Sequence, residues 1–231
     1  MIGHVVLDIE GTTSSLSHVR DVLFPYARRR LRDWLELPLP DVAAVVAEVR
    51  ERTGRPAASL DEVHRVLLDW LDRDVKAPPL KTLQGLIWQQ GYAAGELSSQ
   101  VYEDVPPALR RWREQGAALH VYSSGSVLAQ REWFRHTGAG DLREHFTQHF
   151  DTRSPGSKTE PGSYREIAAR LAAAPDGILF CSDHQGELDA ARAAGLRTLG
   201  VRRPDGSATP LAGHRVVGGF DGLDLTTLEA Q

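Results

Sequence analysis

The stretch VVLDIEGTT, residues 5–13, sets the fold expected for this chain. It starts with the apolar run Val5-Val6-Leu7, which is typical of a buried strand, and it becomes polar at Asp8. Gly11 permits a sharp backbone turn directly after the strand. Because of this turn, the carboxylates of Asp8 and Glu10 can both face one site just beyond the end of the strand.

The pattern changes after Thr13, and apolar residues then recur at helical spacing. Such groups start near Val19, Val42, Val63 and Leu80, and prolines separate them as they do at helix boundaries. No strand candidate interrupts this stretch. We therefore expect residues 17–101 to form an all-helical cap that is inserted after the first strand.

From residue 102 onward, predicted strands alternate with predicted helices. The strands are expected at residues 118–122, 178–181, 198–201 and 216–217, and the helices at 106–114, 127–136, 161–173 and from Asp183 to Ala194. Such alternation predicts an α/β fold with a mostly parallel sheet that is covered on both faces. We expect residues 1–16 and 102–231 to form this core.

The composition is that of an ordinary globular protein, with 41% hydrophobic and 25% charged residues in a chain of 231. A net charge of −4 gives no general attraction to nucleic acid, and no apolar run approaches the ~18 residues of a membrane span. The single cysteine, Cys181, excludes an intramolecular disulfide. Without a visible secretory signal, we expect a cytoplasmic protein with neither nucleic acid nor membrane as partner.

One basic cluster, Arg28-Arg29-Arg30 with Arg32, lies in a helical pattern. A solvated helix face is the favoured interpretation, and a weak anion site is the alternative.

Polar groups follow three of the predicted strands. Asp8 and Glu10 follow the first, Ser123-Ser124 the second and Asp183 a later one. Lys158 stands in a loop just before a helix. Ligands of such sheets bind beyond the carboxyl ends of the strands, so we expect these side chains to share one site.

This set of side chains suits the cleavage of a phosphate ester. Carboxylates from Asp8, Glu10 and Asp183 give the oxygen-rich environment that Mg²⁺ prefers. Lys158 and the hydroxyls of the serine pair can bind a phosphoryl group, which carries a charge of about −1.5 to −2 at neutral pH. Asp8 can then attack phosphorus as a nucleophile.

Each residue also has an ordinary interpretation when it is taken alone. Asp8 and Glu10 could be a turn carboxylate and a surface charge, and Lys158 a solvated lysine. The serine pair could cap a turn, and Asp183 could cap the following helix. Their order along the chain, each close to a strand end, favours a shared active site.

That order of motifs resembles the haloacid dehalogenase superfamily, and within it the enolase-phosphatase (acireductone synthase) family of methionine salvage. The matching segments extend from residue 8 to about residue 203; they include 8–15, 22–26, 83–85, 102–107, 122–127, 150–152 and 187–191. Glu10 is a sharp discriminator, because most superfamily phosphatases have a second aspartate at that position.

The resemblance implies a helical cap over a Rossmann-like core, one Mg²⁺ per chain, and a small phosphorylated diketo metabolite as substrate. Members of this family enolise 2,3-diketo-5-methylthiopentyl 1-phosphate and then remove the phosphate through an aspartyl-phosphate. The resemblance makes Asp8 and Glu10 catalytic. It makes Ser123, Ser124 and Lys158 substrate-binding, and it assigns the metal to Asp8, Glu10 and Asp183. At position 10 the superfamily commonly uses the backbone carbonyl as the metal ligand.

The sequence departs from the family pattern in three places. The loop before Lys158, residues 152–158, is one residue longer than usual, which puts the reach of this lysine in question. His184 follows Asp183 where a small apolar residue is usual, and Gly186 loosens the start of the next helix. His18 stands where an aromatic or apolar residue is expected. A hinge or surface histidine is the favoured interpretation, and a histidine that faces the cleft and titrates near neutral pH is the alternative.

Two other functions stay open. One is a phosphatase of the same superfamily that acts on another small phosphate ester, and the other is a metabolite-binding module without activity. No zinc-ligand spacing, Walker loop or Gly-x-Ser-x-Gly elbow is present, so a zinc enzyme, a nucleotide-binding protein and a serine hydrolase are all disfavoured. The base for enolisation is not identifiable from the sequence, and we expect the chain to act as a monomer.

Overall fold

The computed structural model describes residues 1–206 and 209–228, and its chain divides into two compact units. The first unit consists of Met1–His18 and the chain from Ser99 onward, and the second consists of Val19–Ser98. The sequence placed these boundaries two to three residues away, at 16/17 and 101/102. Each unit is described separately below.

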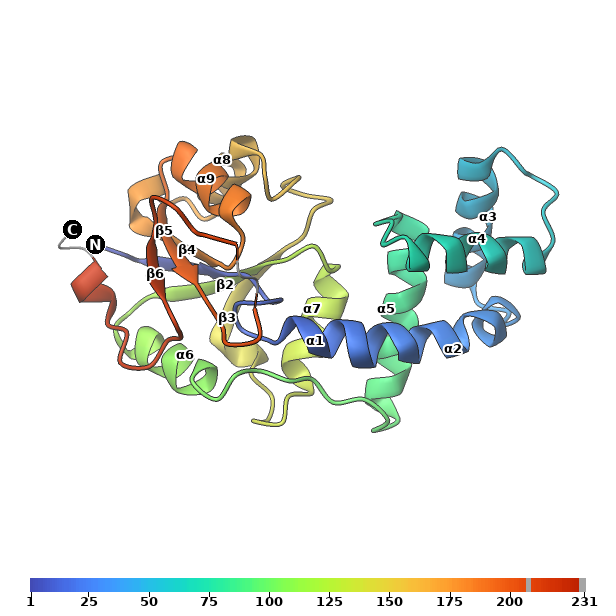
Figure 1. Ribbon diagram of the computed structural model, residues 1–231, viewed down its shortest axis with the longest axis horizontal. Helices are drawn as coiled ribbons and strands as arrows, with labels where there is room; N and C mark the ends of the chain where they lie inside the picture. Colours follow the sequence, from blue (N-terminus) through green and yellow to red (C-terminus); the bar gives the residue numbers. More distant parts are fainter. Residues whose placement is uncertain (207–208, 229–231) are drawn as a thin grey trace. The chain divides into compact units, whose positions relative to one another are not determined.

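A six-stranded sheet forms the centre of the first unit (Figure 1). Its strands are β1 His4–Leu7, β2 Ala118–Tyr122, β3 Phe146–Phe150, β4 Ile178–Ser182, β5 Arg197–Val201 and β6 Arg215–Val217. They lie in the order β3-β2-β1-β4-β5-β6, and all neighbours are parallel. The predicted α/β fold with a parallel sheet is confirmed.

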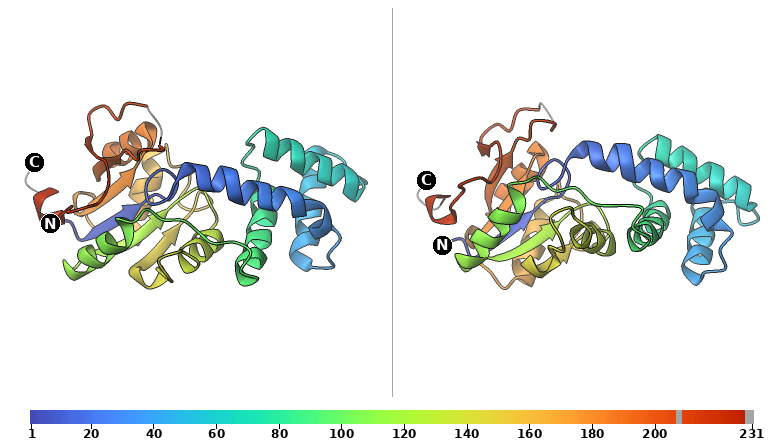
Figure 2. Two further views of the ribbon diagram at one scale, coloured as in Figure 1. Left: turned by 60° about the horizontal axis from the view of Figure 1, so that its bottom comes forward. Right: turned by 90° about the horizontal axis from the view of Figure 1, so that it is seen from below.

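Helices cover both faces of this sheet. Those of the first unit are α1 Leu16–His18, α6 Val105–Glu114, α7 Val127–Arg135, α8 Pro161–Arg170 and α9 Gln185–Ala193, with short 3₁₀ turns η2 Arg143–His145, η3 Pro175–Gly177 and η4 Leu225–Leu228. α6 and α7 lie on one face, whereas α8 and α9 lie on the other (Figure 2). The connections on the two sides of β1 therefore lie on opposite faces, as in doubly wound folds.

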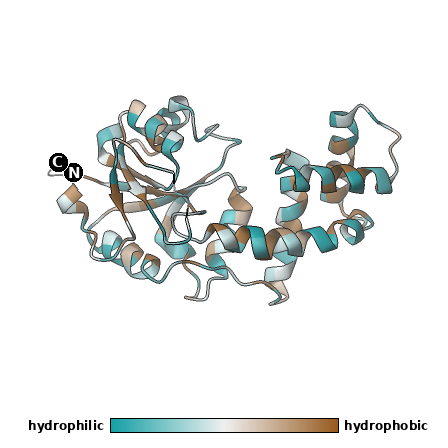
Figure 3. Ribbon diagram, in the orientation of Figure 1, coloured by the Kyte–Doolittle hydropathy of each residue, from teal (hydrophilic) through white to brown (hydrophobic). Residues whose placement is uncertain are grey.

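The strands supply most of the core. Val5, Val6 and Leu7 of β1 are completely buried, as expected for a strand with neighbours on both sides and helices on both faces. In Figure 3 several strands are brown along their length, whereas the helices carry both apolar and polar residues. Burial of such side chains contributes about 25 cal/mol per Å² of apolar surface.

One strand, β3, was not predicted from the sequence. Its residues are Phe146-Thr-Gln-His-Phe150, so three polar residues stand between two phenylalanines. β3 lies at an edge of the sheet, and only its two terminal residues are fully buried. An edge strand does not need the continuous apolar run by which the central strands were recognised.

The second unit contains helices and no strand. They are the π-helical segment η1 Val19–Leu23, α2 Phe24–Leu35, α3 Pro40–Thr53, α4 Leu60–Asp72 and α5 Pro78–Ala93. Pro40 and Pro78 are the first residues of α3 and α5, where the missing amide hydrogen costs nothing. Ser59 and Glu62 form a capping box at the start of α4.

Three arginines of the basic cluster, Arg28, Arg30 and Arg32, are paired with acidic residues. Arg28 pairs with Asp72, and an Arg30 nitrogen lies 2.6 Å from a Glu96 oxygen. This arrangement favours the solvated helix face over the anion site. Within the described part of the chain, no helix combines the length and the apolar character that crossing a bilayer requires.

Two histidines lie side by side within the sheet. His4 Nδ1 and His120 Nε2 are 3.1 Å apart, and the rings stack with centroids 5.4 Å apart. His120 is 1% exposed, and its Nδ1 has no hydrogen-bond partner. Burial, together with the charges that His4 and His149 can carry, lowers the pKa of His120 to about 4. This histidine is therefore neutral at physiological pH.

We expect His120 to make the protein less stable in acid. An unfolded histidine titrates near about 6.5, so the unfolded chain binds the proton first as the pH falls. The free energy of unfolding then decreases from about pH 6.5 down to about pH 4. Between about pH 7.5 and about pH 5.5, His120 should account for about 1 kcal/mol of the loss.

Urea unfolding at these two pH values, with the unchanged protein and with His120→Leu, measures this contribution. Because His4 lies 3.1 Å from His120, the difference between the two losses reports the titration of this histidine pair and not of more distant groups. Equal losses in the two proteins would contradict the assignment.

Candidate active site

The site begins at Asp8, the first residue after β1. Its amide donates to the carbonyl of Cys181 at 3.0 Å, which continues the pairing of β1 with β4. The carboxylate Oδ1 accepts from the Ile9 amide at 2.8 Å. Only 5% of Asp8 is exposed, so its carboxylate depends on protein groups for most of its stabilisation.

Lys158 reaches this carboxylate. Its Nζ lies 2.6 Å from Asp8 Oδ1 and 2.8 Å from Oε2 of Glu187, and 7% of the residue is exposed. Glu187 stands in the first turn of α9 and also accepts from Ser182 Oγ at 2.8 Å. The ammonium group is thus held between two carboxylates that come from different elements of the sheet edge.

The charges of the site alter the acidity of its members. Burial raises the pKa of Asp8 to about 6, although Lys158 opposes this rise. Burial also raises the pKa of Asp183 to about 6, and the charge of Asp8 adds to it. Burial alone would lower the pKa of Lys158, but the carboxylates of Asp8 and Glu187 outweigh it and hold that pKa above its usual value. Lys158 is therefore a permanent cation at neutral pH.

Asp183 lies against the turn that follows Asp8. A Cβ atom built on Gly11 would stand 2.1 Å from Asp183 Oδ2, and Gly11 has a φ of +72°. Only glycine satisfies both conditions, because it lacks the side chain and readily adopts positive φ. The predicted turn at Gly11 therefore also makes room for the second carboxylate.

The serine pair stands at the end of β2, the neighbour of β1. The register pairs Leu7 with Val121, so Ser123 and Ser124 emerge at the same sheet edge as Asp8. Ser123 is buried and its Oγ accepts from the Gly125 amide at 3.3 Å, whereas Ser124 is half-buried. The next helix, α7, starts with Ser126 as its cap.

Asp8 and Asp183 could hold a metal ion. The charge of Asp8 raises the pKa of Asp183, so the two carboxylates repel each other, and a divalent cation with oxygen ligands would relieve this repulsion. No group of three or more His, Cys, Asp or Glu side chains within residues 1–206 and 209–228 is arranged for a metal. The resemblance implies that the third protein ligand is not a side chain but the backbone carbonyl of Glu10.

The half-buried Glu10 stands two residues after Asp8, and a β-bridge to Ser14 closes the turn behind it. Thr13 Oγ1 donates to the Asp8 carbonyl at 3.0 Å, and Trp133 Nε1 donates to Ser14 Oγ at 2.9 Å. The turn is therefore fixed on both sides.

Two of the three departures from the family pattern lie close to this site. One is the longer loop before Lys158, and the other is His18, which contacts Trp133 beside the turn. Despite the longer loop, Lys158 reaches Asp8, so the doubt about its reach is removed. His18 packs edge-on against Trp133, with ring centroids 5.3 Å apart. At the third departure α9 begins at Gln185, directly after His184 and with Gly186 as its second residue.

Glu187 is a residue of this edge to which the sequence assigned no role. Its signal in the sequence was its position, four residues after Asp183 and thus one helical turn into the helix that follows the strand. Residues near the start of such a helix face the carboxyl edge of the sheet. That signal alone does not distinguish a contact with Lys158 from a surface charge.

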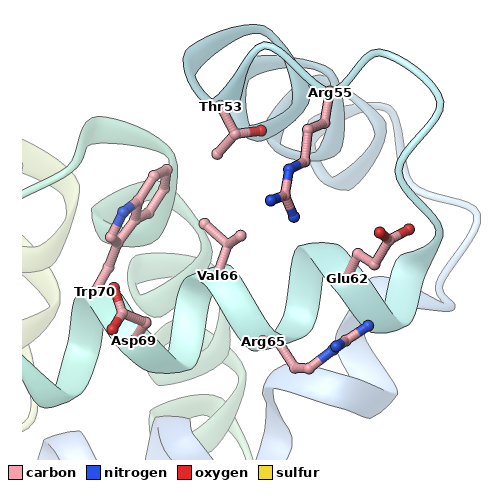
Figure 4. Close-up of a pocket in the computed structure, with 7 residues that line it drawn as sticks. All are labelled: Thr53, Arg55, Glu62, Arg65, Val66, Asp69 and Trp70. Atoms are coloured by element: carbon pink, nitrogen blue, oxygen red, sulfur yellow. The ribbon is translucent and has the colours of Figure 1, made fainter.

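A separate hollow of about 430 Å³ lies within the helical unit, between the end of α3 and the length of α4 (Figure 4). Arg55 and Arg65 line it together with Glu62 and Asp69, so its charges balance. Without a net positive charge it offers little attraction to a phosphate dianion. It does not compete with the sheet edge as an active site.

Comparison with known proteins shows the family of the chain. Residues 2–195 match the family of haloacid dehalogenase-like hydrolases. "Enolase-phosphatase E1" of Streptomyces avermitilis is 53% identical over 97% of this chain and 95% of its own length. The protein of the same name from Nocardia farcinica is 50% identical over 96% of both chains. The chain belongs to the enolase-phosphatase family of haloacid dehalogenase-like hydrolases.

Two solved structures share the fold of this chain. The UTR4 protein of Saccharomyces cerevisiae has a TM-score of 0.81 and 30% identity, and the match covers 96% of this chain and all of that one. CbbY of Rhodobacter sphaeroides has a TM-score of 0.64 at 19% identity, covering 99% of this chain and all of that one, and shows the shared fold alone. The two sequence relatives named enolase-phosphatase confirm the predicted resemblance to that family.

Replacement of Gly11 tests the close approach of Asp183. We expect Gly11→Ala to lower kcat/KM for phosphate release by about 100-fold, because the new methyl group must displace Asp183 or the turn. The matched control is Gly54→Ala, where φ is +65° and no atom lies within 4 Å of the built Cβ.

Both substitutions carry a backbone strain of about 1–2 kcal/mol. Thermal unfolding should therefore shift in both variants, whereas activity should fall only in Gly11→Ala. An equal loss of activity in the two would show that strain, and not the contact with Asp183, causes it.

Proposed function

We propose that this chain is a magnesium-dependent enolase-phosphatase that converts 2,3-diketo-5-methylthiopentyl 1-phosphate to the acireductone of methionine salvage. The contact of Lys158 with Asp8, 2.6 Å long at the carboxyl edge of the sheet, is the observation that carries phosphatase chemistry. Relatives named enolase-phosphatase, identical at half of their positions over nearly the whole length, support the choice of substrate.

Binding of the phosphate is assigned to Lys158 and the serine pair. The ammonium of Lys158 offsets the negative charge of the phosphoryl group, and the hydroxyls of Ser123 and Ser124 can donate to its oxygens. Without this cation a carboxylate nucleophile would be repelled by a phosphate dianion.

Phosphoryl transfer then proceeds in two steps. A carboxylate oxygen of Asp8 attacks phosphorus, the bond from phosphorus to the ester oxygen breaks, and an aspartyl-phosphate forms. Glu10, in its acid form, gives a proton to the leaving oxygen. Its carboxylate next removes a proton from water, which attacks phosphorus and releases inorganic phosphate and free Asp8.

Enolisation precedes this transfer in the proposed sequence. The oxygen that leaves is then part of an enol, which is more acidic than an alcohol and is expelled more easily. The helical unit, Val19–Ser98, is assigned the selection of the methylthio tail, as the resemblance implies.

Magnesium would be held by the carboxylates of Asp8 and Asp183 and by the Glu10 carbonyl. When bound, the ion offsets negative charge that develops on the phosphoryl oxygens. The excess of carboxylates over lysine at this edge fits such a cation. We further propose that the protein acts as a cytoplasmic monomer.

Asp8→Asn should abolish turnover without unfolding the protein. An amide cannot act as the nucleophile, so we expect kcat to fall by at least about 10³-fold. Because burial raises the pKa of Asp8 above its unfolded value, its ionised form costs stability at neutral pH. Loss of the ion pair with the buried Lys158 acts in the opposite direction, so we expect a changed unfolding temperature but a folded variant at the assay temperature, which thermal unfolding checks. Activity equal to that of the unchanged protein would reject Asp8 as nucleophile.

The proposed reaction is tested directly with the diketo-phosphate, by following the enol absorbance and phosphate release together. We expect both signals with Mg²⁺, their loss in excess EDTA, and recovery when Mg²⁺ is returned. Full activity in EDTA would refute the role of the metal.

A panel of other phosphate esters separates the proposed substrate from the alternatives. Faster hydrolysis of a sugar phosphate or of phosphoglycolate would favour a phosphatase of another specificity. Absence of phosphate release from every ester would favour a binding module.

A further inference from the structure

The backbone of the loop that carries Lys158 is held by three side-chain hydroxyls. Tyr122 donates to the Gly156 carbonyl at 2.8 Å, and Ser163 donates to the Ser157 carbonyl at 2.7 Å. Tyr164 donates to the carbonyl of Lys158 itself, also at 2.7 Å. Three consecutive peptide oxygens are thus each bound by a different side chain, from β2 or from α8.

The two tyrosines are themselves fixed by packing. Both are 0% exposed, and their rings meet edge-on with centroids 5.6 Å apart. The ring of Tyr164 also packs against Phe180 of β4, at 5.0 Å between centroids. Aromatic rings in such contacts have little freedom, so their hydroxyls have defined positions.

Burial also keeps these hydroxyls protonated. It raises the pKa of Tyr122 to about 12 and holds the pKa of Tyr164 well above its usual value. Both hydroxyls therefore remain hydrogen-bond donors over the whole physiological range of pH.

The loop is also in tight contact with the start of α8. Gly156 has a φ of +132°, and a Cβ built there would lie 2.9 Å from Ser163 Oγ. A loop with an additional residue has more conformations available than a shorter one. Without specific contacts it would hold the lysine less precisely, and the hydroxyls supply such contacts.

We propose that Tyr122, Ser163 and Tyr164 are positioning residues that fix Lys158 in the place where it binds the phosphoryl group. These residues act through the loop, because the oxygens that they bind are peptide oxygens of Gly156, Ser157 and Lys158. The inference rests on the proposed function for the role of Lys158, whereas the contacts themselves do not depend on it.

Tyr164→Phe is the sharpest test, because it removes one oxygen and leaves the ring. The Lys158 carbonyl loses its buried donor, and the loop must shift or leave that oxygen without a partner. A displacement of about 1 Å can cost about 100-fold in rate. We expect inorganic phosphate, measured by calorimetry on the Mg²⁺-loaded protein, to bind about tenfold more weakly or worse.

Tyr26→Phe is the matched control. Tyr26 is also a buried tyrosine, and its hydroxyl donates to Glu96 at 2.9 Å within the helical unit. Both variants lose one hydroxyl hydrogen bond, and thermal unfolding measures the stability that each loses. Only Tyr164→Phe should weaken the binding of inorganic phosphate, which lacks the methylthio tail. Tyr122→Phe and Ser163→Ala repeat the measurement at the neighbouring carbonyls if Tyr164→Phe does not fold.

The proposal would be overturned if all three loop variants bound inorganic phosphate as tightly as Tyr26→Phe does. Weaker phosphate binding in the loop variants alone would support it. Because calorimetry needs no turnover, it reports on the loop even if the unchanged protein fails to hydrolyse the diketo-phosphate. In that case the proposed function would fail while the positioning of Lys158 would still be measured.

Discussion

The ammonium group of Lys158, buried between the carboxylates of Asp8 and Glu187, is the interaction on which the rest of the site depends. An isolated charge in such a place would cost several kcal/mol in lost solvation. Lys158 and Asp8 each make the burial of the other tolerable, and Glu187 adds a second partner. With Asp183 included, the group holds three carboxylates and one ammonium, which leaves a deficit of positive charge. That deficit suits a divalent cation, while the lysine suits a phosphate.

The topology of the sheet explains how these charges come together. β1 lies between β2 and β4, and the helices that follow these two neighbours cover opposite faces. The carboxyl ends of the central strands therefore diverge and leave room for a ligand. Asp8 leaves the middle of this edge, the serine pair comes from β2, and Asp183 comes from β4. Lys158 arrives on the loop between β3 and α8.

Much of the fold could be predicted because its central strands and its helices have strong periodicity. Val5-Val6-Leu7 is buried on both faces, so an apolar run was sufficient to identify β1. β3 was missed because an edge strand can carry the polar residues Thr147, Gln148 and His149. The apolar pattern of a segment indicates how much of it is buried. It does not indicate which strands or helices are its neighbours in the fold.

The sequence by itself determined which residues could do chemistry: Asp8, Glu10, Asp183 and Lys158 are recognisable from their type and their positions near strand ends. Only the tertiary structure decided that Lys158 pairs with both Asp8 and Glu187, that Gly11 makes room for Asp183, and that two buried tyrosines hold the lysine loop. The reason is physical. Residue type fixes charge and hydrogen-bonding capacity, whereas contacts between residues far apart in the chain depend on how the strands and helices pack.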